Sequence, residues 1–68
     1  MRYAIVIERG EDYFSAHVPD LIGCAASGAT LEEAKDLVKK EIESRLASMR
    51  EDGLPIDEPT TQVDYIEI

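Results

Sequence analysis

Sixty-eight residues, 15 of them acidic and 7 basic, give the chain a formal net charge of -8 at pH 7. A domain of this length buries only about 60% of the surface that its unfolded chain exposes, so its core alone provides marginal stability. The acidic surface repels phosphate, whereas nucleic-acid binding depends chiefly on lysine and arginine. We therefore expect a single domain over residues 1–68 that makes no direct contact with nucleic acid.

Residues that commonly reinforce small domains are scarce. Cys24 is the single cysteine and His17 the single histidine, so neither an intramolecular disulfide nor a zinc site of four nitrogen and sulfur ligands can form. We expect no metal and no cofactor. Packing in a homo-oligomer, a dimer or tetramer, is expected to supply further stability. The apolar run at residues 1–7 is too short for a targeting sequence or a membrane span, which predicts a cytoplasmic protein without membrane contact.

Two N-terminal runs are typical of strands. Residues 2–8 are rich in aromatic and β-branched side chains, which favour strand over helix in so short a run. The polar break at residues 9–12 contains a glycine and predicts a hairpin turn. A second, antiparallel strand over residues 13–18 then places Phe14, Ala16 and Val18 on one face and Tyr13, Ser15 and His17 on the other.

A turn and a short third strand follow. Pro19 lacks the N–H that a sheet ladder requires and ends the second strand. Gly23 supplies a backbone conformation that is closed to other residues. Residues 24–27 are predicted to form the third strand, and Gly28 leads the chain out of it.

A long amphipathic helix is predicted next. Thr30 and Glu33 have the spacing of a capping box, in which the hydroxyl accepts from the N–H three residues on and the glutamate reaches back to the N–H of the cap. The helix therefore begins at Leu31. Apolar residues recur at intervals of three or four as far as residue 50, and Gly53 stops the helix.

The last predicted element is a strand that closes the sheet. Residues 54–61 form a proline-bearing return loop. Residues 62–68 carry apolar side chains on both strand faces, with Val63 and Tyr65 on one and Ile66 and Ile68 on the other. The predicted order is β-β-β-α-β, and the fold class is α+β, an antiparallel sheet with one long helix packed on one face.

Little in the sequence indicates catalysis. His17 falls on the polar face of the second strand, and we interpret it as a surface or interface residue. Cys24 lies among small residues and is predicted to be buried and structural. Asp20 is interpreted as a side chain that stabilises its own turn, because aspartate readily bonds backbone groups there. Four acidic doublets lack the spacing of a calcium loop, and we predict no catalytic residue and no enzyme.

Four segments resemble the HicB-like antitoxin family in residues and spacing. They are Tyr13-Phe14, V-P-D-L-I-G-C at residues 18–24, S-G-A-T-L-E-E-A at residues 27–34, and G-L-P-I at residues 53–56. The resemblance covers essentially the whole chain and implies a partial ribonuclease-H-like fold without the catalytic carboxylates of ribonuclease H. The structural motif residues are Pro19, Gly23, Gly28, Thr30 and Glu33.

The resemblance also implies a function. Members of the family bind and obstruct a HicA-type toxin, a small basic RNA-cleaving protein, and many carry a C-terminal DNA-binding module, which this sequence is expected to lack. An acidic patch can imitate RNA phosphate toward such a toxin. The candidate partner-binding residues are Glu11, Asp12, Tyr13, His17 and Asp20.

A second hypothesis stays open. The same face can form a contact between copies of the chain, as a self-associating structural or small-ligand-binding module with no toxin partner. A basic reading frame of comparable size beside this one would favour the antitoxin hypothesis.

Overall fold

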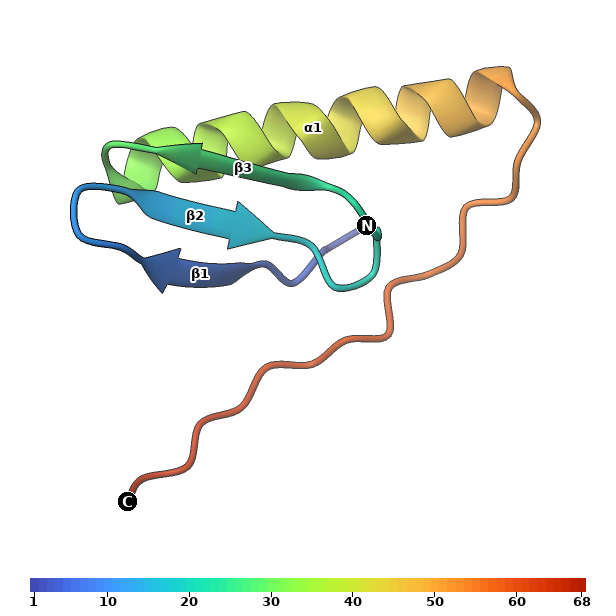
Figure 1. The fold of residues 1–68 in the computed structure, drawn as a ribbon. Coiled ribbons are helices and arrows are strands. Elements are labelled where there is room, and N and C mark those ends of the chain that lie inside the picture. The colour runs from blue at the N-terminus through green and yellow to red at the C-terminus, as the bar shows by residue number, and fades with distance from the viewer.

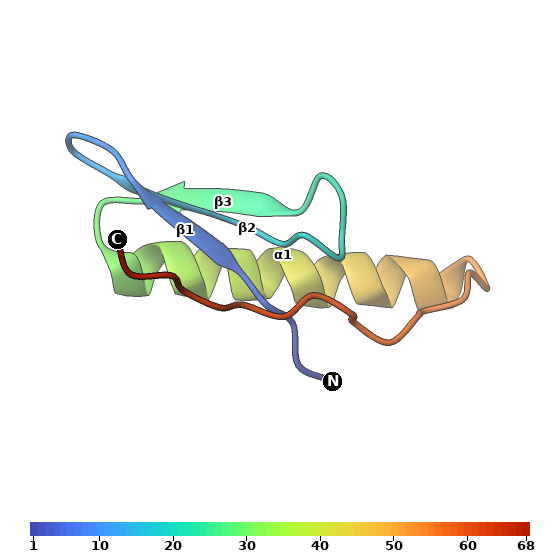
Figure 2. The same ribbon diagram turned by 90° about the horizontal axis from the view of Figure 1, so that it is seen from below.

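The computed structural model describes residues 1–68 as a three-stranded antiparallel sheet covered on one face by a long helix (Figure 1). The strands are β1 (Val6–Arg9), β2 (Phe14–His17) and β3 (Ala25–Gly28), in the spatial order β1-β2-β3, and the helix is α1 (Leu31–Glu51). Figure 2 shows α1 along one face of the sheet and the opposite face uncovered. The α+β class and the β-β-β-α part of the predicted order are confirmed. No helix is long and apolar enough to cross a membrane.

Strand alternation builds the core between the sheet and α1. Ile7, Ala16 and Ala26 pair across the three strands in one row, and this row faces the helix. Ala16 is 2% exposed. The other members of the buried cluster come from the β2–β3 turn and from α1: Val18, Leu21, Cys24 and Val38. Only 6 of 68 residues are buried, so the core is small, as the chain length predicts.

The turn between β2 and β3 is closed by its own backbone. The Val18 N–H donates to the Cys24 carbonyl at 3.0 Å, and the Leu21 and Cys24 N–H groups donate to carbonyls within the same turn. Gly23 has a φ of 86°, which favours glycine because a Cβ there is strained. The predicted roles of Pro19 and Gly23 agree with this geometry.

The helix begins where the sequence predicts. The Thr30 hydroxyl accepts from the Glu33 N–H at 3.1 Å, and α1 starts at Leu31. Glu33 reaches back one residue further than predicted, since its carboxylate accepts from the Ala29 N–H at 3.4 Å. Thr30 therefore caps the start of α1, and the Glu33 carboxylate accepts from a backbone N–H just before it, much as in a capping box.

The end of the helix is a Schellman motif. Gly53 has a φ of 71°, its N–H donates to the Arg50 carbonyl at 3.1 Å, and the Leu54 N–H donates to the Met49 carbonyl at 2.8 Å. These bonds satisfy carbonyl groups that the last turn leaves without helical partners. The predicted stop at Gly53 is confirmed.

The first strand starts later than predicted, at Val6 instead of residue 2. Val6 pairs with His17, and continuing that register would place Ala4 opposite Pro19. Proline has no N–H to donate to a strand on the β1 side. Pairing of the first strand with β2 therefore ends at Val6.

The predicted final strand is wrong. Residues 62–68 are extended but pair with no strand, and the segment diverges from β1 toward the C-terminus (Figure 1). Tyr65 and Ile66 are each 86% exposed. A strand exists only where a neighbouring backbone completes its ladder, and in the single chain an open gap separates the start of this segment from residues 2–4.

Candidate protein-binding surface

The uncovered face of the sheet carries short side chains over much of β2 and β3. It consists of the residues that alternate with the helix-facing row, paired across the strands as Val6, His17 and Ala25, and as Glu8, Ser15 and Ser27. We call these six residues the outer sheet face. A shallow hollow of about 450 Å³ lies over β2 and β3, because alanine and serine leave little volume above the strands. An uncovered face of this kind suits contact with another protein surface.

The β1–β2 hairpin adds charge at one end of this face. Glu11 and Asp12 are exposed at its tip, close in sequence to Glu8. Arg9 supplies one positive charge there, so this end of the sheet carries three carboxylates against one guanidinium. The hairpin is therefore net acidic.

Tyr13 is presented to solvent by the same hairpin. The Gly10 N–H donates to the Tyr13 carbonyl at 2.8 Å, which closes the turn. The Tyr13 ring lies directly over Gly10, where any Cβ would collide with it, and the side chain is 52% exposed. A glycine at this position thus allows an aromatic ring to lie flat over the hairpin and still offer half of its surface to a partner.

Three of the five candidate residues lie together at the β1–β2 hairpin. Glu11, Asp12 and Tyr13 directly precede β2 in the hairpin, and His17 ends that strand on its outer side. His17 is exposed in the middle of the row that crosses all three strands. Asp20 lies in the turn after β2, at the opposite end of that strand.

Asp20 holds the C-terminal part of the chain. Its carboxylate accepts from the Thr60 N–H at 3.3 Å, from the Thr60 hydroxyl at 3.4 Å and from the Thr61 N–H at 3.3 Å. Desolvation acts to raise the pKa of Asp20, but the hydrogen bonds from Thr60 and Thr61 together outweigh it, and the pKa lies below its ordinary value. The interpretation of Asp20 as stabilising its own turn is corrected, since it joins two segments forty residues apart.

Cys24 belongs to the core. Its side chain is 3% exposed. Burial raises the pKa of the Cys24 thiol, the nearby Arg45 guanidinium opposes this, and Glu41 adds to it. Since the thiolate is the reactive form, the raised pKa agrees with the predicted structural role.

The sequence did not single out Thr60 and Thr61. They lie in a predicted loop, and their partner is distant in sequence, so no local pattern indicates the bond. The one available signal was chemical, because two adjacent threonines beside Pro59 offer several donors to a carboxylate. Nor did the sequence analysis select Val6, Ala25 and Ser27, which join His17 and Ser15 on the outer sheet face only through the strand register.

Comparison with known proteins identifies the family to which this sequence is similar. A family model described as "HicB_like antitoxin of bacterial toxin-antitoxin system" matches residues 3–67. A UPF0150 protein of Archaeoglobus fulgidus is 43% identical over 56 residues, which span 78% of this chain and 81% of that protein. An uncharacterized 14.9 kDa protein in the rep-hol intergenic region of Haemophilus phage HP1 is 39% identical over 64 residues. That match spans 91% of this chain and 48% of the phage protein, so the chain corresponds to about half of it. No solved structure shows a significant match.

Proposed function

Because this chain belongs to the HicB-like antitoxin family, we propose that it binds a small basic HicA-type toxin and blocks RNA cleavage by covering the toxin's surface. The family match over residues 3–67 carries this proposal. Steric blocking needs only a complementary surface. The outer sheet face and the hairpin together offer one.

The negative charge of the chain supports the proposal that its partner is a basic protein. The chain has a net charge of -8, and a positively charged protein is attracted to such a field before contact. Glu11 and Asp12 extend at the tip of the hairpin, where they can pair with lysine or arginine side chains that otherwise bind RNA phosphate. We expect these two residues to determine the association rate and its dependence on salt.

Aromatic contact supports affinity. Interface residues that contribute most to binding are enriched in tyrosine, tryptophan and arginine. Tyr13 is half exposed, and its ring lies over Gly10, where a partner can cover it. His17 is exposed on the same strand face, and we propose that Tyr13 anchors the contact while His17 extends it across the sheet.

Asp20 takes a different part in the proposal. Its carboxylate already accepts hydrogen bonds from Thr60 and Thr61, and it lies at the opposite end of β2 from the hairpin. A toxin that contacts Asp20 therefore contacts the C-terminal part of the chain as well. Glu11, Asp12 and Tyr13 at the hairpin, with His17 at the other end of β2, form the primary surface in this proposal.

Calorimetric titration of the full chain with a purified HicA-type toxin from the same genome tests the proposal. We expect tight binding at low ionic strength that weakens as salt is added. The double variant Glu11→Gln with Asp12→Asn should lower affinity several-fold and reduce the salt dependence. Tyr13→Ala should lower affinity by about tenfold or more, as expected for a buried aromatic anchor.

A matched control keeps the overall charge change but moves it elsewhere. Asp57 and Glu58 form an exposed acidic doublet in the segment after α1, and Asp57→Asn with Glu58→Gln should bind almost as the unmodified chain does. Equal losses for both double variants would show that only the overall field matters and would remove the hairpin from the surface. Absence of binding at low ionic strength would contradict the proposed function.

A further inference from the structure

The part of the chain after α1, residues 55–68, is tied to the rest of the molecule at one residue. Every hydrogen bond between it and residues 1–54 ends on the Asp20 carboxylate, which accepts from the Thr60 N–H, the Thr60 hydroxyl and the Thr61 N–H. All remaining bonds lie within one part or the other. After α1, three residues are half-buried and none is buried. Because local stability depends on such contacts and bonds, docking of residues 55–68 depends chiefly on Asp20.

The turn that carries Asp20 does not need these bonds for its own structure. The N–H groups of Val18, Leu21 and Cys24 each donate to a carbonyl within the turn. The side chains of the same three residues are buried in the core between the sheet and α1. Asp20 is therefore a fixed point on the folded body, and loss of its bonds to the C-terminal part leaves the turn, the sheet and α1 in place.

The charges around the Asp20 carboxylate oppose docking. Asp57 and Glu58 line the same pocket of about 300 Å³ as Asp20, and no lysine, arginine or histidine lines it. Like charges around so small a pocket repel one another, because the screening length in water is about 10 Å at 0.1 M salt. Hydrogen bonding to Asp20 and repulsion from Asp57 and Glu58 therefore act in opposite directions on the same part of the chain.

We propose that Asp20 acts as a latch for the C-terminal part of the chain. Residues 55–68 dock while the Asp20 carboxylate holds Thr60 and Thr61, and they detach as one unit, with the sheet and α1 still folded, when these bonds open. The balance between hydrogen bonding and charge repulsion keeps both forms accessible. The latch is a property of the single chain and does not depend on a toxin.

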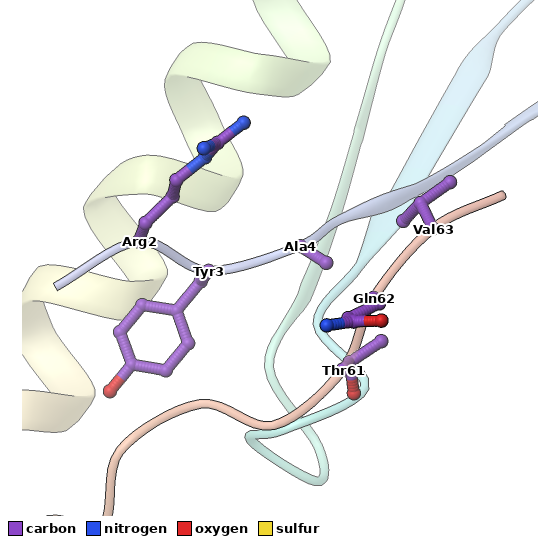
Figure 3. A pocket seen from close by; sticks show the side chains of 6 residues that line it. All are labelled: Arg2, Tyr3, Ala4, Thr61, Gln62 and Val63. Atoms are coloured by element: carbon purple, nitrogen blue, oxygen red, sulfur yellow. The ribbon is translucent and has the colours of Figure 1, made fainter.

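The latch determines where the exposed apolar C-terminus leaves the molecule. In the docked form, Figure 3 shows residues 61–63 opposite residues 2–4 across an open gap of about 530 Å³. The side chains of Tyr65 and Ile66, which follow, are each 86% exposed. Opening of the latch frees this apolar segment from the N-terminal stretch and opens the pocket that residues 55–60 share with the turn after β2. The latch thus controls which apolar surfaces the chain presents.

Amide hydrogen exchange of the full chain, followed by NMR, tests the latch. Asp20→Asn removes the charge and one acceptor oxygen, so exchange of the Thr60 and Thr61 amides should accelerate by about tenfold or more. Heteronuclear NOEs should fall together across the C-terminal part, whereas exchange of the core amides of Ala16 and Val38 should change by less than about twofold. Unchanged exchange at Thr60 and Thr61 would overturn the latch. Equal acceleration of the core amides would overturn it too, because the opening would then be global.

A second variant shifts the balance in the opposite direction. Asp57→Asn with Glu58→Gln removes the repulsion around the pocket and should slow exchange of the two threonine amides by about twofold or more. Glu11→Gln with Asp12→Asn makes the same charge change at the hairpin, at the other end of β2, and should leave their exchange as it is. Equal slowing by both double variants, or no slowing by Asp57→Asn with Glu58→Gln, would contradict the proposed balance.

Discussion

At residue 28, close packing against α1, and not an unusual backbone angle, explains why the residue is glycine. A Cβ at this position would lie 2.8 Å from the Glu33 Cγ and 2.9 Å from the Ala34 backbone nitrogen. The backbone of α1 is held by its own hydrogen bonds and cannot move away cheaply. Glycine at residue 28 is therefore required for the helix to start directly under the end of β3.

Gly28→Ala should destabilise the chain by about 1–3 kcal/mol, the usual cost of forcing extra volume into a packed site. Urea denaturation followed by circular dichroism measures the loss. Gly10→Ala is the comparison, since its Cβ meets the Tyr13 ring, which is half exposed and can swing outward. Equal losses for the two variants would contradict the packing argument.

Thr30 stabilises the start of α1 through one oxygen. Its hydroxyl accepts from the Glu33 N–H at 3.1 Å, so Thr30→Ala should cost about 0.5–2 kcal/mol in unfolding free energy. Thr30→Ser keeps the oxygen and should retain most of the stability. Thermal melts in which the alanine and serine variants behave alike would argue against the cap.

The hydrogen bonds to Asp20 should make the stability of the chain sensitive to acid. Its folded pKa lies below its ordinary value because Thr60 and Thr61 donate to the charged carboxylate. A depressed folded pKa means that the stabilisation is present above the unfolded pKa of about 3.9 and is lost as pH falls through the folded pKa. Amide resonances of Thr60 and Thr61 should shift in that acidic window, and Asp20→Asn should remove the shift. A pH profile that is identical in the variant would refute the assignment.

Among the secondary-structure elements, those features that depend on residues close in sequence were predicted correctly. The hairpin, the Thr30 cap and the Gly53 stop each depend on residues within a few positions, and the structure has all three. The predicted start of β1 was wrong because it depends on the residue that the register would place opposite Ala4, which is Pro19 in the turn after β2. The final strand was wrong because the alternation of residues 62–68 indicates burial but not which backbone completes the ladder.

In the candidate surface, too, the features that depend on nearby residues were predictable and those that depend on distant residues were not. Tyr13 and His17 share a face because strand alternation is local, and the structure places them there. The separation of Asp20 from the hairpin, and its bonds to Thr60 and Thr61, depend on how the chain returns after α1. Contacts between residues forty positions apart leave no periodic signal, so a single sequence does not reveal them.

At the scale of the whole molecule, a small core is joined to an exposed apolar segment. With 6 of 68 residues buried, the single chain has little stability to spare. The homo-oligomer expected from the sequence would stabilise the folded state by mass action. The melting temperature should therefore rise with protein concentration, as differential scanning fluorimetry over a wide concentration range can measure. A melting temperature independent of concentration would count against association.

RNA cleavage reports directly on the proposed neutralisation of a toxin. A purified HicA-type toxin from the same genome, incubated with labelled RNA, is titrated with the full chain at low ionic strength. We expect cleavage to fall to the blank rate once binding is saturated, and the Tyr13→Ala variant to need about tenfold more protein for the same inhibition. Cleavage that continues unchanged at saturating chain would contradict it.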